Sequence, residues 1–518
     1  MAGHVNLMDD CLISNLPPAA LRSALRLLVS QGASTQQPFV EHIRSRFYEN
    51  PPHFDEPEKL FPGDGVVSEA CLAYLAQTRC IFSCKLSEES FPYLRHFLEA
   101  IPRAKVRWTE GGELAMLLAK FDGDIVQAVQ ALKESSPELN PKLSGSINSL
   151  LANLGNCRWY CEDLHPPLPF PFARAMRQVK DVLAILFPEH TGTVNTTKEA
   201  KLAVSNKTAE RNVMEKVWLG SFPAPRLFNG LWQVSSPSWG SGSAQSQEAA
   251  LLHAVEHGLN ATDMADHYGD AELIYGDFRS KLASDIRSTT YAATKWCIFS
   301  PVPKPIATEF VLDAVRERCR RLRGRVDLLQ FHWYNYEDKA YLNILVELVR
   351  ITRSHAELVS AIGLCNFDSE HVEESCKYLI AETGSVGIIS NQVQFSLVDA
   401  RPLRKMTRYF DMILSWGTWK EFQALLEGIS TIAHKHGVSL TNIATRWVLQ
   451  QPAVGAVIVG TRLGISDHVA ENLKVFEFEL DDNDMYSING IALGSSRQKV
   501  TALFDKLGDC GNEYRKMH

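Results

Sequence analysis

The chain has 518 residues, of which 45% are hydrophobic and 22% are charged, and its formal net charge is −7. This length suits two or more domains, and the composition is typical of a soluble globular protein. The small net charge indicates neither a nucleic-acid nor a membrane partner, and no stretch approaches the ~20 apolar residues that a membrane helix needs.

Targeting and cysteine patterns point to the cytoplasm. The first residues lack the basic stretch and apolar core of a secretory signal peptide. The 11 cysteines are odd in number and irregularly spaced, and the pairs Cys80/Cys84 and Cys157/Cys161 do not match the C-x-x-C of zinc or redox sites. We therefore expect reduced thiols and a cytoplasmic protein.

Residues 1–188 predict a mainly helical domain. A helix can open at Pro18 and stop at Gly32, and residues 113–134 and 172–186 carry apolar side chains at helical spacing, the former interrupted near Gly123. This half contains no motif with recognisable chemistry. Its role and any protein partner therefore stay open.

Residues 189–215 are polar and rich in threonine, asparagine and lysine. Such composition predicts a linker between two domains. The alternative is that it forms the exposed start of the second domain.

Residues 216–518 alternate between strand and helix patterns, which predicts a parallel sheet. The expected strands cover residues 227–234, 260–265, 290–295, 326–332, 358–365, 387–395 and 454–460, and the expected helices cover 247–257, 307–321, 342–353, 369–379, 422–436 and 466–475. No G-x-G-x-x-G follows an early strand, which disfavours an open dinucleotide-binding sheet. We therefore expect an α/β fold of the (β/α)8 TIM-barrel type.

Four residues in this half are suited to carbonyl reduction: Asp263, Tyr268, Lys295 and His332. Three lie at or near the ends of expected strands and Tyr268 lies in a following loop, so all four can meet at the carboxyl-terminal mouth of a barrel. Each alone is more often structural, as a turn tyrosine, a solvated lysine or a buried histidine. Their order, spacing and strand context together favour an active site.

Their chemistry is complementary. A free tyrosine has a pKa of ~10 and is a poor acid at neutral pH. The ammonium of Lys295, anchored by Asp263, would favour the phenolate and lower that pKa, and His332 could donate a hydrogen bond to a carbonyl oxygen. The hydride must come from a cofactor, because no side chain can provide it.

Residues 227–476 resemble the aldo-keto reductase family. The resemblance is carried by Asp263-Met-Ala-x-x-Tyr268-Gly, Thr294-Lys295, Gln330-Phe-His332, Ile362-Gly-Leu-Cys-Asn366-Phe, Asn391-Gln392-Val, Gly460-Thr-Arg462 and Glu471-Asn472. It implies a (β/α)8 barrel that binds NADPH without a Rossmann fold and acts on small carbonyl or alcohol substrates. Tyr268 would be the acid, tuned by Lys295 and Asp263, and His332 would orient the carbonyl.

The resemblance also implies a cofactor site. Asn366 and Gln392 would hold the nicotinamide carboxamide, Arg462 would meet the 2′-phosphate, and Glu471 with Asn472 would reach the adenine. Cys365 stands where the family often has serine, and His468 stands where many members carry a second basic residue. Because the guanidinium of Arg462 suits a phosphate, NADP is the expected cofactor.

The stretch between Gln392 and Gly460 is short for this family. In one interpretation, residues 412–416 form a compressed seventh strand, and Trp416 stacks on the nicotinamide. In the other, Trp416 already leads into the next helix, and a strand near Phe410 and Asp411 is missing. A remnant of seven strands would leave two unpaired edges.

We therefore predict an NADP-dependent oxidoreductase that reduces an aldehyde or ketone, or oxidises the corresponding alcohol. The alternative is a catalytically impaired binding or regulatory protein with an incomplete cofactor site. A metal hydrolase is disfavoured, because no His-x-His closes the first strand and Lys295 would repel a cation. The substrate is set by loops of variable length and cannot be read from these motifs.

Overall fold

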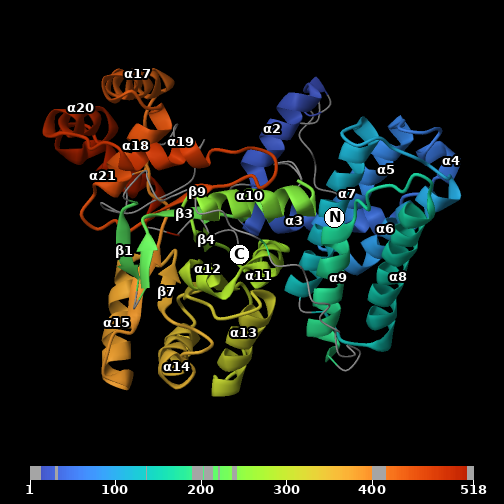
Figure 1. The fold of residues 1–518 in the computed structure, drawn as a ribbon, viewed down its shortest axis with the longest axis horizontal. Helices are drawn as coiled ribbons and strands as arrows, with labels where there is room; N and C mark the ends of the chain where they lie inside the picture. Colours follow the sequence, from blue (N-terminus) through green and yellow to red (C-terminus); the bar gives the residue numbers. More distant parts are fainter. Residues whose placement is uncertain are drawn as a thin grey trace.

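The computed structural model describes residues 13, 15–29, 33–135, 137–188, 202, 214–219, 222–235, 242–399, 416–509 and 511. Figure 1 shows two neighbouring parts, which we call the helical region (described residues up to 188) and the α/β region (described residues from 214). Of the predicted linker, only residues 202, 214 and 215 are described. The domain boundaries stay a prediction.

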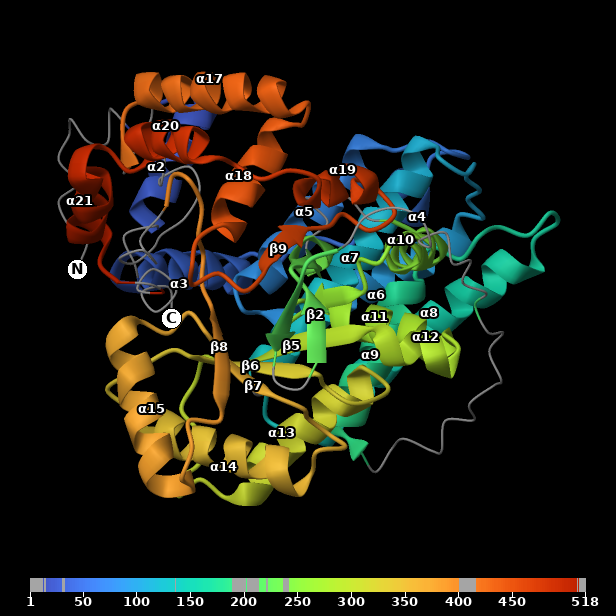
Figure 2. The same ribbon diagram turned by 60° about the vertical axis from the view of Figure 1, so that its left-hand side comes forward.

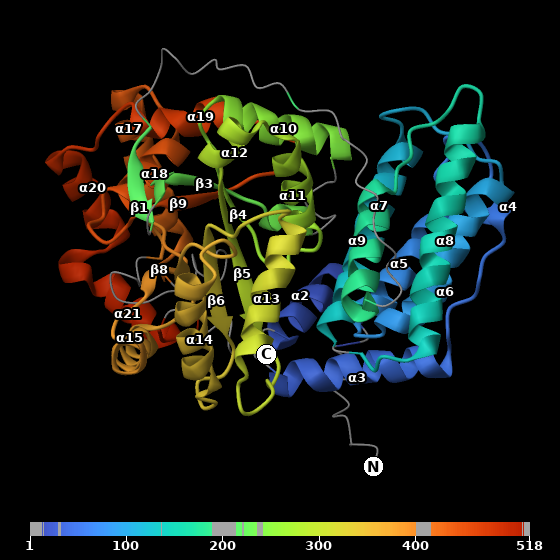
Figure 3. The same cartoon turned by 60° about the horizontal axis from the view of Figure 1, so that its bottom comes forward.

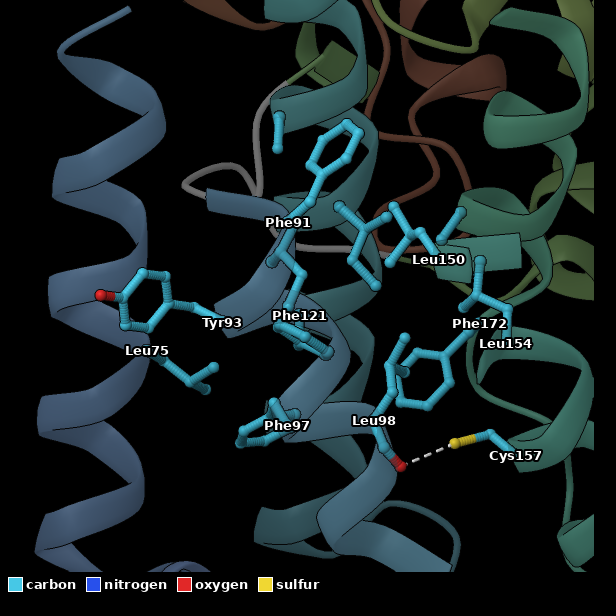
Figure 4. Close-up of a cluster of buried hydrophobic side chains, with 14 of the residues drawn as sticks. Leu75, Phe91, Tyr93, Phe97, Leu98, Phe121, Leu150, Leu154, Cys157 and Phe172 are labelled. Carbon is cyan, nitrogen blue, oxygen red and sulfur yellow. Dashed lines mark hydrogen bonds between the residues drawn. The ribbon is translucent and has the colours of Figure 1, made fainter. Parts of the chain in front are cut away.

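The helical region is a bundle around aromatic side chains. Its helices are α2 (Pro18–Val29), α3 (Ala33–Glu49), α4 (Pro57–Leu60), α5 (Glu69–Ser83), α6 (Ser87–Arg103), α7 (Glu113–Glu134), α8 (Pro141–Asp163) and α9 (Ala173–Leu186), and the buried core residues come from α4 onward. Phe91, Phe97, Phe121 and Phe172 are fully buried at its centre (Figure 4). The rings of Phe97 and Phe121 lie 4.3 Å apart, centroid to centroid. The bundle therefore has a hydrophobic core of its own.

Helix α7 differs from the sequence prediction. It is continuous over 22 residues, and the interruption predicted near Gly123 is wrong. Gly123 is buried within the helix, and Phe121, Ile125 and Val129 on either side of it are fully buried. Tertiary packing therefore overrides the low helix propensity of glycine.

The α/β region contains one parallel seven-stranded sheet and a small hairpin. The strands are β1 (Lys216–Leu219), β2 (Phe222–Pro225), β3 (Leu227–Gly230), β4 (Ala261–Asp263), β5 (Tyr291–Ile298), β6 (Leu328–Trp333), β7 (Ile362–Cys365), β8 (Ile388–Gln392) and β9 (Val457–Gly460). β1 and β2 form the antiparallel hairpin, and the sheet order is β8-β7-β6-β5-β4-β3-β9. The predicted fold class is confirmed: a curled parallel sheet with many helices follows a helical amino-terminal region.

Helices alternate with these strands and also form a group of their own near the end of the chain. They are α10 (Ala244–Glu256), α11 (Ala271–Lys281), α12 (Ser284–Thr289), α13 (Thr308–Arg321), α14 (Ala340–Ser354), α15 (Ser369–Thr383), α17 (Trp419–His436), α18 (Leu440–Leu449), α19 (Val469–Leu473), α20 (Asp482–Ala492) and α21 (Gln498–Leu507). Figure 2 shows α17, α20 and α21 gathered on one side of the molecule, away from α13, α14 and α15. No helix in the described part of the chain is long and apolar enough to span a bilayer.

Among the described residues, the sheet stays open between β8 and β9, which flank the stretch where the sequence suggested a missing strand. β8 and β9 form its two edges, and residues 393–399 and 416–456 add no strand to it. Phe410 and Asp411, where the missing strand was expected, lie outside the described residues. Across the residues described, seven strands are thus present where a closed barrel of this type has eight.

The two regions share an interface rich in charged residues. Figure 3 shows α7 and α9 of the helical region beside α11 and α13 of the α/β region. Lys133 pairs with Glu317 at 2.8 Å, and Arg177 pairs with Asp277 at 2.6 Å. Through these ion pairs the helical region packs against α11 and α13 of the α/β region.

Candidate active site

Asp263, Lys295 and His332 come together because three neighbouring parallel strands end at one edge. Asp263 ends β4, Lys295 lies in β5 and His332 lies in β6, and the register pairs Asp263 with Ala293 and Cys297 with His332. All three side chains are buried. The three residues therefore lie on adjacent strands, and their catalytic roles stay a prediction.

A buried ion pair is the centre of the arrangement. Lys295 Nζ lies 2.5 Å from Asp263 Oδ2 and donates a second hydrogen bond to the carbonyl oxygen of Met264 at 2.9 Å. Gln330 Nε2 donates to the other carboxylate oxygen, Asp263 Oδ1, at 2.7 Å. Because both carboxylate oxygens are engaged, Asp263 holds the lysine in one direction.

The lysine faces the tyrosine. Lys295 Nζ lies 4.9 Å from the centroid of the Tyr268 ring. Tyr268 follows β4 in a tight turn, in which its N–H donates to the carbonyl oxygen of Ala265 at 3.1 Å. The Tyr268 ring also packs against His267, with 4.7 Å between centroids. Tyr268, the Lys295 ammonium and the Asp263 carboxylate thus occupy one site.

The electrostatics differ from the sequence prediction in one respect. Burial raises the pKa of Tyr268 well above its usual value, and the Lys295 ammonium lowers it by a smaller amount. Burial disfavours the ammonium of Lys295, but the Asp263 carboxylate raises the pKa of Lys295 above its usual value. The predicted net lowering of the tyrosine pKa is therefore wrong for this structure, because desolvation outweighs the lysine. The Tyr268 hydroxyl is therefore protonated at neutral pH.

His332 is oriented by backbone. Its Nδ1 lies 3.1 Å from the carbonyl oxygen of Cys365, which ends β7. A carbonyl can only accept, so Nδ1 carries a proton and donates. The neutral ring then presents Nε2 as an acceptor, and only the imidazolium donates from both nitrogens.

Asn366 and Gln392 lie at the ends of the next two strands. The N–H of Asn366 donates to the carbonyl oxygen of Gln392 at 2.9 Å, and Asn366 has a φ of 60°, a left-handed conformation that asparagine tolerates well. The side-chain Oε1 of Gln392 is buried and accepts no hydrogen bond from any residue that the structure describes. An amide N–H from a ligand would satisfy this acceptor. The pair therefore fits a carboxamide such as that of nicotinamide.

The residues predicted for the rest of the cofactor follow β9. Arg462 is exposed two residues after the end of that strand. Glu471 accepts a hydrogen bond from Asn442 at 2.9 Å and pairs with Lys474 at 2.8 Å. Asn472 is half-buried in α19. Arg462 is thus exposed to solvent, and Glu471 has protein partners.

A sequence model of the family described as "Aldo/keto reductase family" matches residues 226–415 and 403–492, which together span just over half of the chain. The chain belongs to the aldo/keto reductase family. The two matched segments meet at the stretch that is short in this chain. Family membership supports an oxidoreductase that acts on carbonyl compounds, as the sequence predicted.

Individual relatives agree with this assignment. An aldo-keto reductase of Mycobacterium marinum is 30% identical over 263 residues, which cover 49% of this chain and 85% of that protein. The methylglyoxal reductase DkgA of Salmonella typhimurium is 25% identical over 272 residues, covering 51% of this chain and 88% of that protein. The crystal structure of a Gox0644 mutant in complex with NADPH has a TM-score of 0.41 and 24% identity, covering 54% of this chain and 93% of that one.

Trp416 is placed apart from the other predicted residues of this aldo/keto reductase. Its indole N–H donates to the carbonyl oxygen of Ala492 at 2.7 Å, and Lys499 Nζ lies 3.9 Å from its ring. It is buried in a cluster with Leu425 and other apolar residues of α17, α18 and α20. This packing matches the interpretation in which Trp416 leads into the following helix. Its role at the cofactor stays a prediction without structural support.

Sequence reasoning gave no role to two residues of the site. Gln330 was noted only as part of a motif, yet it lies two residues before His332 on β6, so both side chains face the same side of the sheet. That spacing could have revealed it. Arg318, which pairs with Asp266 beside the tyrosine turn, carried no such signal, because its helix lies far along the chain.

Proposed function

We propose that this protein reduces an aldehyde or ketone, or oxidises the corresponding alcohol, with NADP as cofactor and Tyr268 as the proton donor. The observation that carries the proposal is the line from the buried Asp263 and Lys295 to the half-buried Tyr268. Such a line is unusual for a purely structural turn, because burying an ammonium carries a desolvation cost even when a carboxylate lies beside it. Functional sites are where such costs are commonly found.

The residues have separate tasks in this reaction. In reduction, the phenol of Tyr268 gives its proton to the carbonyl oxygen, and Lys295 stabilises the phenolate that remains. Asp263 and Gln330 keep the ammonium in place. His332 would donate a hydrogen bond to the same carbonyl oxygen and so stabilise its developing charge. In oxidation the proton moves in the opposite direction.

The cofactor, when bound, would supply the hydride for the carbonyl carbon. Asn366 and Gln392 would hold its carboxamide, and the unpartnered Gln392 Oε1 supports this assignment. The exposed Arg462 would pair with the 2′-phosphate, which favours NADP over NAD. Glu471 and Asn472 are proposed for the adenine, and Glu471 would there have to share its carboxylate with Asn442 and Lys474.

The test is NADPH oxidation in the presence of small carbonyl compounds, beginning with methylglyoxal because a relative is named for it. Tyr268→Phe should lower the rate by ~10²–10⁴-fold while leaving NADPH binding nearly unchanged, since only a proton donor is lost. Tyr378→Phe, which removes a hydroxyl from the exposed face of α15, is the matched control. An active wild type whose rate is the same in Tyr268→Phe would contradict the assignment.

A second candidate function is favoured by the open edge between β8 and β9. The protein would then keep the tetrad and act as a binding or regulatory protein with little turnover. Quenching of tryptophan emission by NADPH separates the two candidates. No quenching and no binding by calorimetry would favour the second.

A further inference from the structure

The turn that carries Tyr268 is held from outside the barrel. We call residues 265–270, between β4 and α11, the tyrosine loop. Gln130 of α7 donates through Nε2 to the carbonyl oxygen of Asp266 at 3.2 Å. Arg174 of α9 donates to both carboxylate oxygens of Asp270, at 3.1 and 2.7 Å. Each contact lies two residues from Tyr268, one on either side.

Of the two contacts, the one made by Arg174 is a buried ion pair. Arg174 is 4% exposed and Asp270 is fully buried. Burial alone would raise the pKa of Asp270, yet the guanidinium of Arg174 holds that pKa below its ordinary value. Arg174 also donates to the carbonyl oxygen of Val234 at 3.0 Å, so one side chain joins α9 to the loops after β3 and β4. A bidentate, planar contact of this kind fixes direction as well as distance.

Backbone geometry narrows the loop further. Gly269, which follows Tyr268, has a φ of +58°, a conformation that side chains other than glycine rarely adopt. A Cβ at Gly269 would lie 3.0 Å from Val126 Cγ1 of α7. The helical region therefore packs directly against Gly269, whose backbone conformation sets the direction of the chain just after Tyr268.

A second line of charges starts from α9 and reaches the other side of the site. Asp181 lies 3.5 Å from Arg321 Nη1, and Arg321 Nη2 donates to the carbonyl oxygen of Gly269 at 2.8 Å. Arg321 also pairs with Glu272 at 2.9 Å, and Glu272 accepts a hydrogen bond of 2.5 Å from Thr294, the residue before Lys295. The helical region is thus connected to both the acid and its cation.

We propose that Arg174 and Gln130 are positioning residues for Tyr268, so that the helical region is a working part of the reductase site. They do not touch the reacting atoms; they fix the loop that carries the proton donor. This inference rests on the proposed function for its kinetic consequence, but not for its structural one. A displacement of about 1 Å at a reacting group is enough to cost ~10²-fold in rate.

The test uses the full-length protein and three variants. Arg174→Met and Gln130→Ala remove the two contacts, and Lys133→Gln removes an ion pair of the same interface that reaches α13 instead of the tyrosine loop. We expect kcat to fall by ~10–100-fold in Arg174→Met and less in Gln130→Ala, with KM for NADPH nearly unchanged. Lys133→Gln should stay within twofold of the wild type. Arg174→Lys, which keeps the charge without the bidentate fork, should recover part of the loss.

Amide hydrogen exchange provides a readout that needs no activity. The peptide that contains residues 265–270 should exchange faster in Arg174→Met and Gln130→Ala than in the wild type and in Lys133→Gln. If Arg174→Met does not fold, Gln130→Ala carries the test, since it breaks no ion pair and removes only the hydrogen bonds of Gln130 with Asp266, Glu134 and Gln178.

The outcomes separate the two proposals. An inactive wild type whose loop exchanges faster in the two variants would sink the proposed function and keep the positioning role. Folded variants with unchanged exchange and unchanged kcat would overturn the positioning role. A fall in kcat that is matched by Lys133→Gln would overturn it as well, because the effect would then belong to the interface as a whole.

Discussion

Two parts of the sheet, β3 to β6 and the edges at β8 and β9, differ in how completely their residues are paired. Around the carboxyl ends of β3 to β6, the buried charges are paired, and Gln330 donates a hydrogen bond to Asp263. The helical region holds the tyrosine loop through the contact of Arg174 with Asp270. From β8 to β9, the described residues leave the edges unpaired, and Trp416 packs among helices. The difference teaches that the half of the site around Tyr268 is fixed by many contacts, whereas the half proposed for the cofactor depends on fewer.

The largest effect should come from breaking the charge pair on the well-built side. Lys295→Met leaves the Asp263 carboxylate buried and unpaired, so the free energy of unfolding should fall by about 3–5 kcal/mol, and reductase activity should disappear. Urea denaturation at neutral pH measures the first and NADPH oxidation the second. Lys281→Met, at the partly exposed pair with Glu248, should cost about 1 kcal/mol or less. Equal losses in the two variants would remove the distinction.

The next effect tests the other side. Trp416→Ala should lower the free energy of unfolding by about 3–5 kcal/mol, because a large buried aromatic is truncated. NADPH binding should change little, and NADPH should quench tryptophan emission about as well in the variant as in the wild type. Trp419→Ala, a neighbouring but exposed tryptophan, is the control for emission and for helix α17. Loss of both quenching and binding, with stability retained, would return Trp416 to the cofactor.

The smallest effect sharpens the assignment of the cofactor half. Arg462→Ala should weaken NADPH binding by about 1.5–3 kcal/mol, roughly ten- to a hundredfold, and should leave NADH binding nearly unchanged, because only NADPH carries the 2′-phosphate. Competition titrations with the two cofactors measure both constants. Arg497→Ala, in a turn before α21, controls for a general change of surface charge. Equal weakening for both cofactors would show that Arg462 has a structural role.

The sequence was most informative where function depends on strand ends. Asp263, Lys295 and His332 could be predicted to meet because parallel strands have one carboxyl-terminal edge, and the structure brings them there. The direction of the shift in the Tyr268 pKa could not be predicted, because the burial that raises this pKa depends on tertiary packing and not on neighbours in sequence. Helices α18 and α20 were also not predicted.

Contacts between the regions were beyond sequence reasoning for a simpler reason. Arg174 and Asp270 are 96 residues apart, and nothing in either segment marks one as the partner of the other. Trp416 was ambiguous because an aromatic residue suits both a stacking face and a helix core, and only the hydrogen bond to Ala492 separates the two. Gly123 was misread because the pattern shows a weak helix former and not the core around it.

The buried ion pairs at the interface also bear on the order of synthesis. A ribosome completes the helical region first, and domains generally fold as they emerge. Asp270, Arg320 and Arg321 are the ion-pair partners of Arg174 and Asp181 and are made later, so a helical region that folded first would hold both side chains without these partners. The nascent barrel thus meets a ready surface as soon as its second and third strand–helix units appear, and those are the units that carry Tyr268 and Lys295.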